Sequence, residues 1–133
     1  MVLAERIRKA INEHDIEAFV ACVDSEYQSE QPAHPARAFR GADQVRTNWS
    51  GLFQEIPDIQ AELLGTARDG DTEWAEWRWH GTRTNGSHFE MRGVTVMHTR
   101  ADRALRARLY MEEVDSSGED IDHTVRRLSG AEG

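Results

Sequence analysis

The chain has 133 residues, of which 38% are hydrophobic and 30% charged, enough for one compact domain with a single core. Its 24 acidic and 16 basic side chains give a formal net charge of −8, which argues against nucleic acid and anionic membranes as partners. The longest apolar run, residues 18–23, is far shorter than a membrane-spanning helix of roughly 20 residues, so we expect a cytoplasmic protein without a membrane partner.

The N-terminal segment predicts two helices and a short strand. Apolar residues spaced three and four apart indicate an amphipathic helix over residues 2–13. Asp15 can cap a short second helix, whose apolar stripe ends at Val23. Residues 26–31 are expected to form a strand. Cys22 has no second cysteine for a disulfide or a metal site, so we expect a buried structural thiol.

A loop and a third helix follow. Pro32 and Pro35 favour an extended loop that continues to Gly41. Residues from about 42 to 55 keep a regular helical spacing of apolar side chains, and Pro57 ends the helix. The first half of the domain is therefore expected to be mostly helical.

The second half has the period of strands. Strands are expected from 59 to a turn at 69–71, and then over 72–84, 88–99 and 105–114. Asn85-Gly86 provides the residues that tolerate positive φ in a tight hairpin. Helices followed by four consecutive strands predict an α+β fold, in which three helices pack on the concave side of a curved antiparallel sheet.

The last part of the chain is polar and rich in glycine and serine. We assign residues 1–115 to the domain and residues 116–133 to a C-terminal tail. Within the tail, Ile121, Val125 and Leu128 share one face and can form a short helix.

A strongly bent sheet closed at one end by helices is expected to leave a pocket near its open end. The segment 72–84 carries Trp74, Glu76, Arg78 and His80 on one face. With this face turned inward, Glu76, Arg78 and His80 would form a proton-transfer set, and Trp74 would contact the substrate. A salt bridge on a solvated face is the equally open alternative.

The opposite face of the same segment carries Trp77 and Trp79. Two bulky indoles imply burial against a further surface, and with the helices on the concave side we expect that surface to be a second subunit. Together with Tyr110, these tryptophans predict a homodimer formed through the outer face of the sheet.

Other elements are expected to contribute side chains to the pocket. These are His34 on the proline-bracketed loop, Trp49 on the third helix, Met91, Leu109 and Met111 on the last strands, and Glu113 at the rim. Each also has a structural alternative, as a surface histidine, a core side chain or a solvated acid. No histidine has metal-site spacing, so we expect no metal and no cofactor.

Four short motifs follow one another along the chain: Gly41-Ala42-Asp43-Gln44-Val45 at a helix opening, Pro57-Asp58, Gly81-Thr82, and Tyr110-Met111-Glu112. In this order they resemble the SnoaL-like members of the nuclear-transport-factor-two-like superfamily, over about residues 3–115. The resemblance implies a conical α+β barrel that is usually dimeric. The group includes polyketide cyclases, ketosteroid isomerases and limonene epoxide hydrolase.

Within that group, Tyr27-Gln28-Ser29 resembles the stretch with which limonene epoxide hydrolase holds its water, with Ser29 in place of an asparagine. The resemblance implies that Tyr27 takes part in catalysis and that Ser29 contacts the substrate. The likeness ends at the acid residues. The positions that carry an arginine and two aspartates in that enzyme are Glu76, Arg78 and Leu109 here.

Polyketide cyclases of the group use an acid near the end of the last strand as general acid or base. In this sequence, Glu112 or Glu113 is the candidate for that role. The identity of the base therefore stays open between Glu76 and these two residues.

Two functions from different classes fit these observations. The first is a cofactor-independent lyase, isomerase or hydrolase that acts on a small, largely apolar molecule. Glu76 would accept the proton, Arg78 would stabilise negative charge, and Tyr27 or His80 would orient the substrate. The second is a non-catalytic small-molecule carrier or a dimeric interaction module of the same fold.

Overall fold

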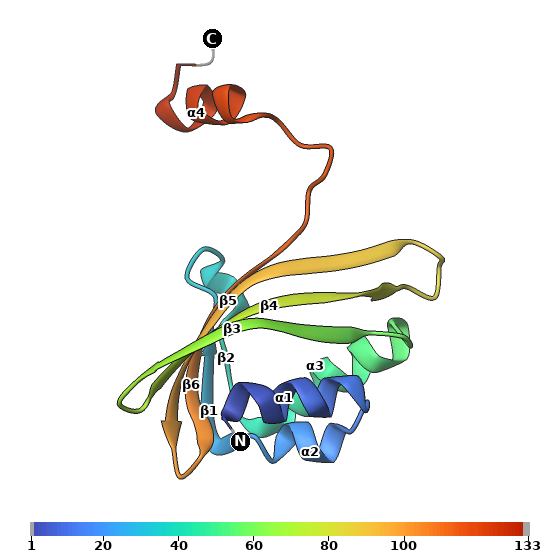
Figure 1. The fold of residues 1–133 in the computed structure, drawn as a ribbon, viewed down its shortest axis with the longest axis vertical. Coiled ribbons are helices and arrows are strands. Elements are labelled where there is room, and N and C mark those ends of the chain that lie inside the picture. The colour runs from blue at the N-terminus through green and yellow to red at the C-terminus, as the bar shows by residue number, and fades with distance from the viewer. Residues whose placement is uncertain (1, 132–133) are drawn as a thin grey trace.

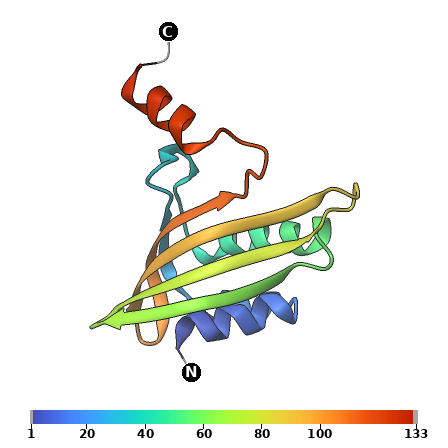
Figure 2. The same cartoon turned by 45° about the horizontal axis from the view of Figure 1, so that its top comes forward.

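A computed structural model describes residues 2–131 and shows a single curved sheet of six strands in the order β2-β1-β6-β5-β4-β3 (Figure 1). The strands are β1 (Val23–Glu30), β2 (Phe39–Arg40), β3 (Gln60–Asp69), β4 (Thr72–Thr82), β5 (His88–Arg100) and β6 (Arg103–Glu113). The longest strands lie side by side and bend together (Figure 2). The sheet is open and has the shape of a curved cone.

The sheet is mixed, which corrects the expectation of a purely antiparallel one. β1 pairs with β6 in parallel, and the other neighbours are antiparallel. The reason is the path of the chain. After β2 it crosses the concave side as a helix to the far edge, and it returns strand by strand until β6 runs beside β1 in the same direction.

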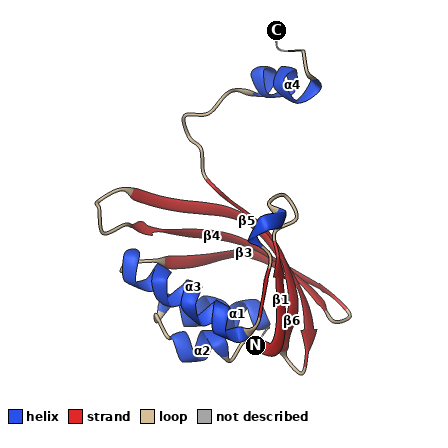
Figure 3. Ribbon diagram, turned by 180° about the vertical axis from the view of Figure 1, so that it is seen from behind, coloured by secondary structure: helices blue, strands red, loops and turns tan. Residues whose placement is uncertain are grey.

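Three helices cover the concave side of the sheet, as expected (Figure 3). They are α1 (Leu3–Asn12), α2 (Ile16–Val20) and α3 (Ala42–Glu55). The Asp15 side chain accepts a hydrogen bond from the Ala18 N–H and so caps α2, as its sequence position predicts.

The N-terminus of α1 is capped from the sheet. Its N-cap residue, Val2, has no side-chain acceptor, and Glu73 Oε2 on β4 accepts a hydrogen bond of 3.1 Å from the Ala4 N–H. Glu73 is fully buried. This contact places α1 against β4 and helps to fix where the concave side begins.

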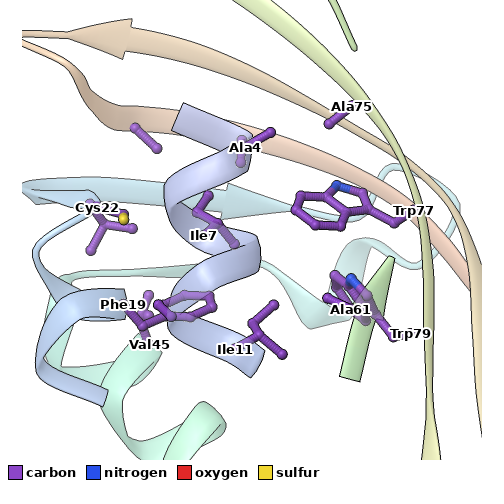
Figure 4. Packing of buried hydrophobic residues seen from close by; sticks show 14 of the residues in the cluster. Ala4, Ile7, Ile11, Phe19, Cys22, Val45, Ala61, Ala75, Trp77 and Trp79 are labelled. Atoms are coloured by element: carbon purple, nitrogen blue, oxygen red, sulfur yellow. The ribbon is translucent and has the colours of Figure 1, made fainter. Parts of the chain in front are cut away.

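The core lies between the helices and the sheet. Trp77 and Trp79 point from β4 toward the apolar faces of the helices, where Ile11, Phe19 and Val45 are buried with them (Figure 4). The cluster also contains Cys22, a buried free thiol as expected, and burial raises the pKa of this thiol.

The chain continues past β6 into a separate helix, α4 (Ile121–Ser129), which stands away from the sheet at the end of segment 114–120 (Figure 1). Asp120 caps it, and Ile121, Val125 and Leu128 are all exposed. The short helix expected in the tail is thus present. Within residues 2–131, no helix combines the length and apolar character needed to cross a membrane.

Candidate functional site

The concave side holds a cavity of about 250 Å³ between the sheet and the three helices. Six aromatic side chains form much of its wall: Phe19, Tyr27, Phe39, Trp49, Trp77 and Trp79. Four of them contact one another in series: the ring centroids of Phe19 and Trp49 are 4.7 Å apart, those of Trp49 and Trp79 5.3 Å, and those of Trp79 and Trp77 6.2 Å. Tyr27 and Phe39 form a separate pair at 6.1 Å. Both strands and helices therefore contribute aromatic side chains to the wall.

Several residues singled out in the sequence lie in this wall. They are Tyr27, Ser29, Trp49, Met91, Leu109 and Met111. The strands explain the grouping, because residues two apart on one strand face the same side, as Tyr27 and Ser29 do on β1. A role of these residues in binding or catalysis stays a prediction.

The expected orientation of β4 is wrong. Ala75, Trp77 and Trp79 are buried on the concave side, whereas Glu76 is exposed on the convex side. In the folded chain the helices pack against the aromatic face, and burying two indoles there releases far more apolar surface from water than burying the charged face would. Because side chains alternate between the two faces of a strand, the charged residues of β4 lie on the convex face, apart from the buried Glu73 at its start.

Arg78 and His80 consequently lie in an ion-pair network on the convex face. Arg78 contacts Glu90 at 2.8 Å and Glu62 at 2.7 Å, and His80 Nε2 lies 3.3 Å from Glu62. Hydrogen bonds from Arg78 and Arg92 lower the pKa of Glu90 to about 2. Of the two alternatives for this face of β4, the solvated salt bridge is therefore the one observed. Glu76, Arg78 and His80 do not face the cavity.

The reversed orientation of β4 also contradicts the prediction that Trp77 and Trp79 lie on the outer face of the sheet. Trp77 and Trp79 face the cavity, so they cannot form an outer dimer surface. Trp74 lies on the convex face instead of the pocket, and Tyr110 is exposed there as expected. Register explains the grouping, since Tyr110 and Glu76 both pair with Val94.

Two further pocket candidates lie outside the cavity wall. His34 Nε2 is 2.7 Å from Glu112 Oε1, a contact that joins the loop after β1 to the end of β6. Glu113 pairs with Arg83 at 2.8 Å. Both acids near the end of the last strand are therefore engaged with basic side chains at the surface, and neither lines the cavity.

The polar groups of the cavity are few and neutral, with one exception. Deep in the wall, the Trp77 Nε1–H donates to Thr95 Oγ1 at 3.0 Å. Burial raises the pKa of the Tyr27 phenol, an effect that the neighbouring Ser29 hydroxyl opposes. Of the described residues that line the cavity, none is Asp, Glu or His, and only Arg37 carries a charge.

Three polar lining residues were not anticipated from the sequence: Gln31, Arg37 and Asn48. Gln31 follows β1, Arg37 ends the short 3-10 helix η1 (Pro35–Arg37), and Asn48 lies on α3. The sequence signal that could have found Arg37 is the proline-bracketed loop, since His34 on that loop was expected to contribute to the pocket. Across residues 2–131, no group of three or more His, Cys, Asp or Glu side chains could hold a metal ion.

The sequence pattern of the SnoaL-like domain matches residues 4–107, which is most of the cone. The chain belongs to the SnoaL-like family. This membership confirms the resemblance carried by the four sequence motifs. No curated protein matches the sequence.

Solved structures share the SnoaL-like fold at low sequence identity. A ketosteroid isomerase-like protein from Catenulispora acidiphila, solved in complex with trimethylamine, superposes with a TM-score of 0.71 at 15% identity, covering 81% of this chain and 83% of the other. An epoxide hydrolase of M. tuberculosis, similar to limonene epoxide hydrolase, has a TM-score of 0.71 at 14% identity and coverages of 83% and 80%.

IdmH, a candidate polyketide cyclase from Streptomyces antibioticus, has a TM-score of 0.70 at 17% identity, with coverages of 83% and 89%. These likenesses show the fold alone. The SnoaL-like fold family contains cyclases, isomerases and epoxide hydrolases, so the chemistry of this member depends on its own cavity.

Proposed function

We propose that this protein binds a small, largely apolar molecule in the cavity of its cone. The observation that carries the proposal is the composition of the wall, which is aromatic and aliphatic from the strands to the helices. A dry cavity of about 150 Å³ accommodates benzene. By that measure, a cavity of about 250 Å³ suits a body of roughly ten non-hydrogen atoms.

Binding without acid–base chemistry is favoured over the catalytic alternative. Glu76, Arg78 and His80 lie on the convex face, and no carboxylate or imidazole is found among the described residues of the wall. Apart from Arg37, Tyr27 is the ionisable group of the described wall that remains for an enzyme. Its raised pKa keeps the phenol protonated at neutral pH, so it can donate a hydrogen bond or a proton but cannot act as the base.

A cavity-filling variant tests the proposal. Ala107 is buried in the wall on β6, and Ala107→Leu reduces the space available to a ligand. Ala67→Leu is the matched control, because Ala67 is exposed on β3 outside the cavity. We expect 2-naphthol at ten times its Kd to raise the Tm of the wild type and of Ala67→Leu by about 3–5 °C. Ala107→Leu should show no rise.

The proposal fails when 2-naphthol leaves the Tm of the wild type unchanged, or when Ala107→Leu binds it as well as the control does. Unfolding curves without ligand show whether Ala107→Leu is folded. Leu109→Phe provides a second filling variant, since Leu109 also lines the cavity.

A homodimer through the convex face is also proposed. Trp74 and Tyr110 are exposed on that face, where they could contact a second copy in place of Trp77 and Trp79. Sedimentation equilibrium distinguishes a dimer from a monomer. The cytoplasmic location stays a prediction.

A further inference from the structure

We propose that the ligand of the cavity is a carboxylate, whose apolar body lies in the aromatic pocket and whose anionic group is bound by Arg37 at the mouth. This inference rests on the proposed function and names the class of molecule that the site takes. Arg37 and Asn48 line the cavity and are themselves exposed, so they mark where the cavity opens to solvent.

The charge of Arg37 is not neutralised by an acid within residues 2–131. Its Nη1 donates to the neutral Gln31 Oε1 at 3.0 Å, and among the described residues no carboxylate lies within ion-pair distance of its guanidinium. Glu112 on β6 contacts His34, which precedes Arg37 in the same loop. The remaining N–H groups of Arg37 are therefore available for a planar acceptor such as a carboxylate, which matches the guanidinium in geometry.

The two amides at the mouth also present donors. Gln31 Oε1 accepts the hydrogen bond from Arg37, and the Gln31 NH₂ group donates to no partner within the part of the chain that the structure describes. Asn48 Oδ1 accepts a hydrogen bond of 2.7 Å from Gln44 Nε2 within α3, and the Asn48 NH₂ group likewise has no acceptor among residues 2–131. Each carbonyl oxygen thus already accepts one hydrogen bond. Within residues 2–131, these three side chains keep N–H groups that make no hydrogen bond, and such donors favour a ligand rich in acceptors.

The position of Arg37 is set by the backbone of the loop. Pro35 begins η1, the Arg37 N–H donates to the His34 oxygen at 2.9 Å, and the Ala38 N–H donates to the Pro35 oxygen at 3.3 Å. The His34 contact with Glu112 ties the same loop to β6. The guanidinium therefore extends from an ordered turn, so less conformational entropy is lost when it binds a ligand.

An aromatic pocket can also attract a cation by cation–π contacts. Here that alternative is disfavoured, because the described residues of the wall include no carboxylate to balance a cation and Arg37 would repel it. The formal net charge of −8 makes general attraction of anions unfavourable, so any preference for an anion must come from local groups such as Arg37.

Isothermal titration calorimetry with three probes that share a naphthalene body tests the inference at neutral pH and low salt. The probes are 2-naphthoate, the neutral 2-naphthamide and the cationic 2-naphthylmethylammonium. We expect wild-type protein to bind 2-naphthoate about tenfold more tightly than 2-naphthamide, at the lower end of what hydrogen bonds to charged groups supply. The ammonium probe should bind most weakly. Raising the salt concentration should reduce the preference.

Variants assign the preference to Arg37. Arg37→Gln should bind 2-naphthoate and 2-naphthamide equally, and Arg37→Lys should keep part of the preference because it keeps the charge without the planar fork. Arg40→Gln is the matched control. Arg40 is an exposed arginine three residues away that does not line the cavity, and its substitution should leave the preference intact.

Equal binding of the three probes, or tighter binding of the ammonium probe, overturns the inference but leaves the proposed function standing. A preference for 2-naphthoate that survives in Arg37→Gln overturns the role of Arg37. Failure of every probe to bind contradicts both the inference and the proposed function.

Discussion

At the scale of single residues, two tryptophans of β4 are buried to a similar extent but differ in the hydrogen bonding of their indole N–H groups. Trp77 and Trp79 are both buried on the concave side. The Trp77 Nε1–H donates to Thr95 Oγ1, whereas the Trp79 Nε1–H is buried and has no acceptor within residues 2–131. A buried donor without an acceptor costs free energy, so the two indoles do not stabilise the fold equally.

Substitution by phenylalanine should separate the two contributions. Trp77→Phe and Trp79→Phe each remove part of a buried indole, and Trp77→Phe also removes a hydrogen bond. We expect Trp77→Phe to lower the free energy of unfolding by about 1 kcal/mol more than Trp79→Phe does. Urea denaturation measures both values.

The exposed Trp74 supplies the control for these variants, and Trp74→Phe should change the free energy of unfolding by less than about 0.5 kcal/mol. An equal loss in the two buried variants, or a larger loss at Trp79, would contradict the assignment of the hydrogen bond.

At the scale of elements, the close approach of β5 and β6 depends on one glycine. Gly93 pairs with Met111, and a Cβ atom at position 93 would lie 2.0 Å from the Tyr110 backbone oxygen. A backbone oxygen cannot move away without breaking the ladder of β6. This pairing also carries Leu109 and Met111 into the cavity wall, so the glycine bears on the site as well as on the sheet.

A pair of glycine substitutions should change stability in opposite directions. Gly93→Ala should lower the free energy of unfolding by at least about 2 kcal/mol because of the clash. Gly51→Ala should raise it by about 0.5–1 kcal/mol, since Gly51 lies inside α3 and an added Cβ atom there would meet no atom within 4 Å. Thermal and urea unfolding check both, and a harmless Gly93→Ala would show that β5 and β6 are farther apart.

At the scale of the whole molecule, the cone and the C-terminal helix are separate. The apolar stripe of α4 is exposed, and Leu128 retains 72% of its accessible surface. A nine-residue helix has little stability of its own without a packing partner. The division of the chain at residue 115 therefore stays a proposal that removal of the tail can test.

A chain that ends at residue 115 should unfold within about 0.5 kcal/mol of the full chain and bind 2-naphthol with the same Kd. The reason is that the cavity wall is complete by Met111. A chain that ends at residue 107 is the control and should not fold stably, because it loses the part of β6 that contains Leu109 and Met111. A marked loss of stability in the chain that ends at residue 115 would show that α4 packs on the cone in solution.

Much of this architecture follows from local patterns in the sequence. The helical spacing and Pro57 predict a helix over 42–55, and α3 spans Ala42–Glu55. Alternation and the Asn85-Gly86 hairpin predict β4 and β5 to within a few residues. These features are local, because hydrophobic period, proline and turn residues act over a few positions. The order of the motifs also identifies the SnoaL-like family.

The tertiary structure decided which face of β4 looks inward and what lines the mouth of the cavity. Period two divides Trp77 and Trp79 from Glu76 and Arg78 but does not say which pair is buried, since that depends on what packs against each face. The donors at the mouth come from the loop after β1 and from α3, which the folded chain brings together around the cavity. A sequence by itself determines the hydrophobic period of its helices and strands. Which face of a strand is buried, and which residues line a cavity, depend on contacts between residues far apart in the chain.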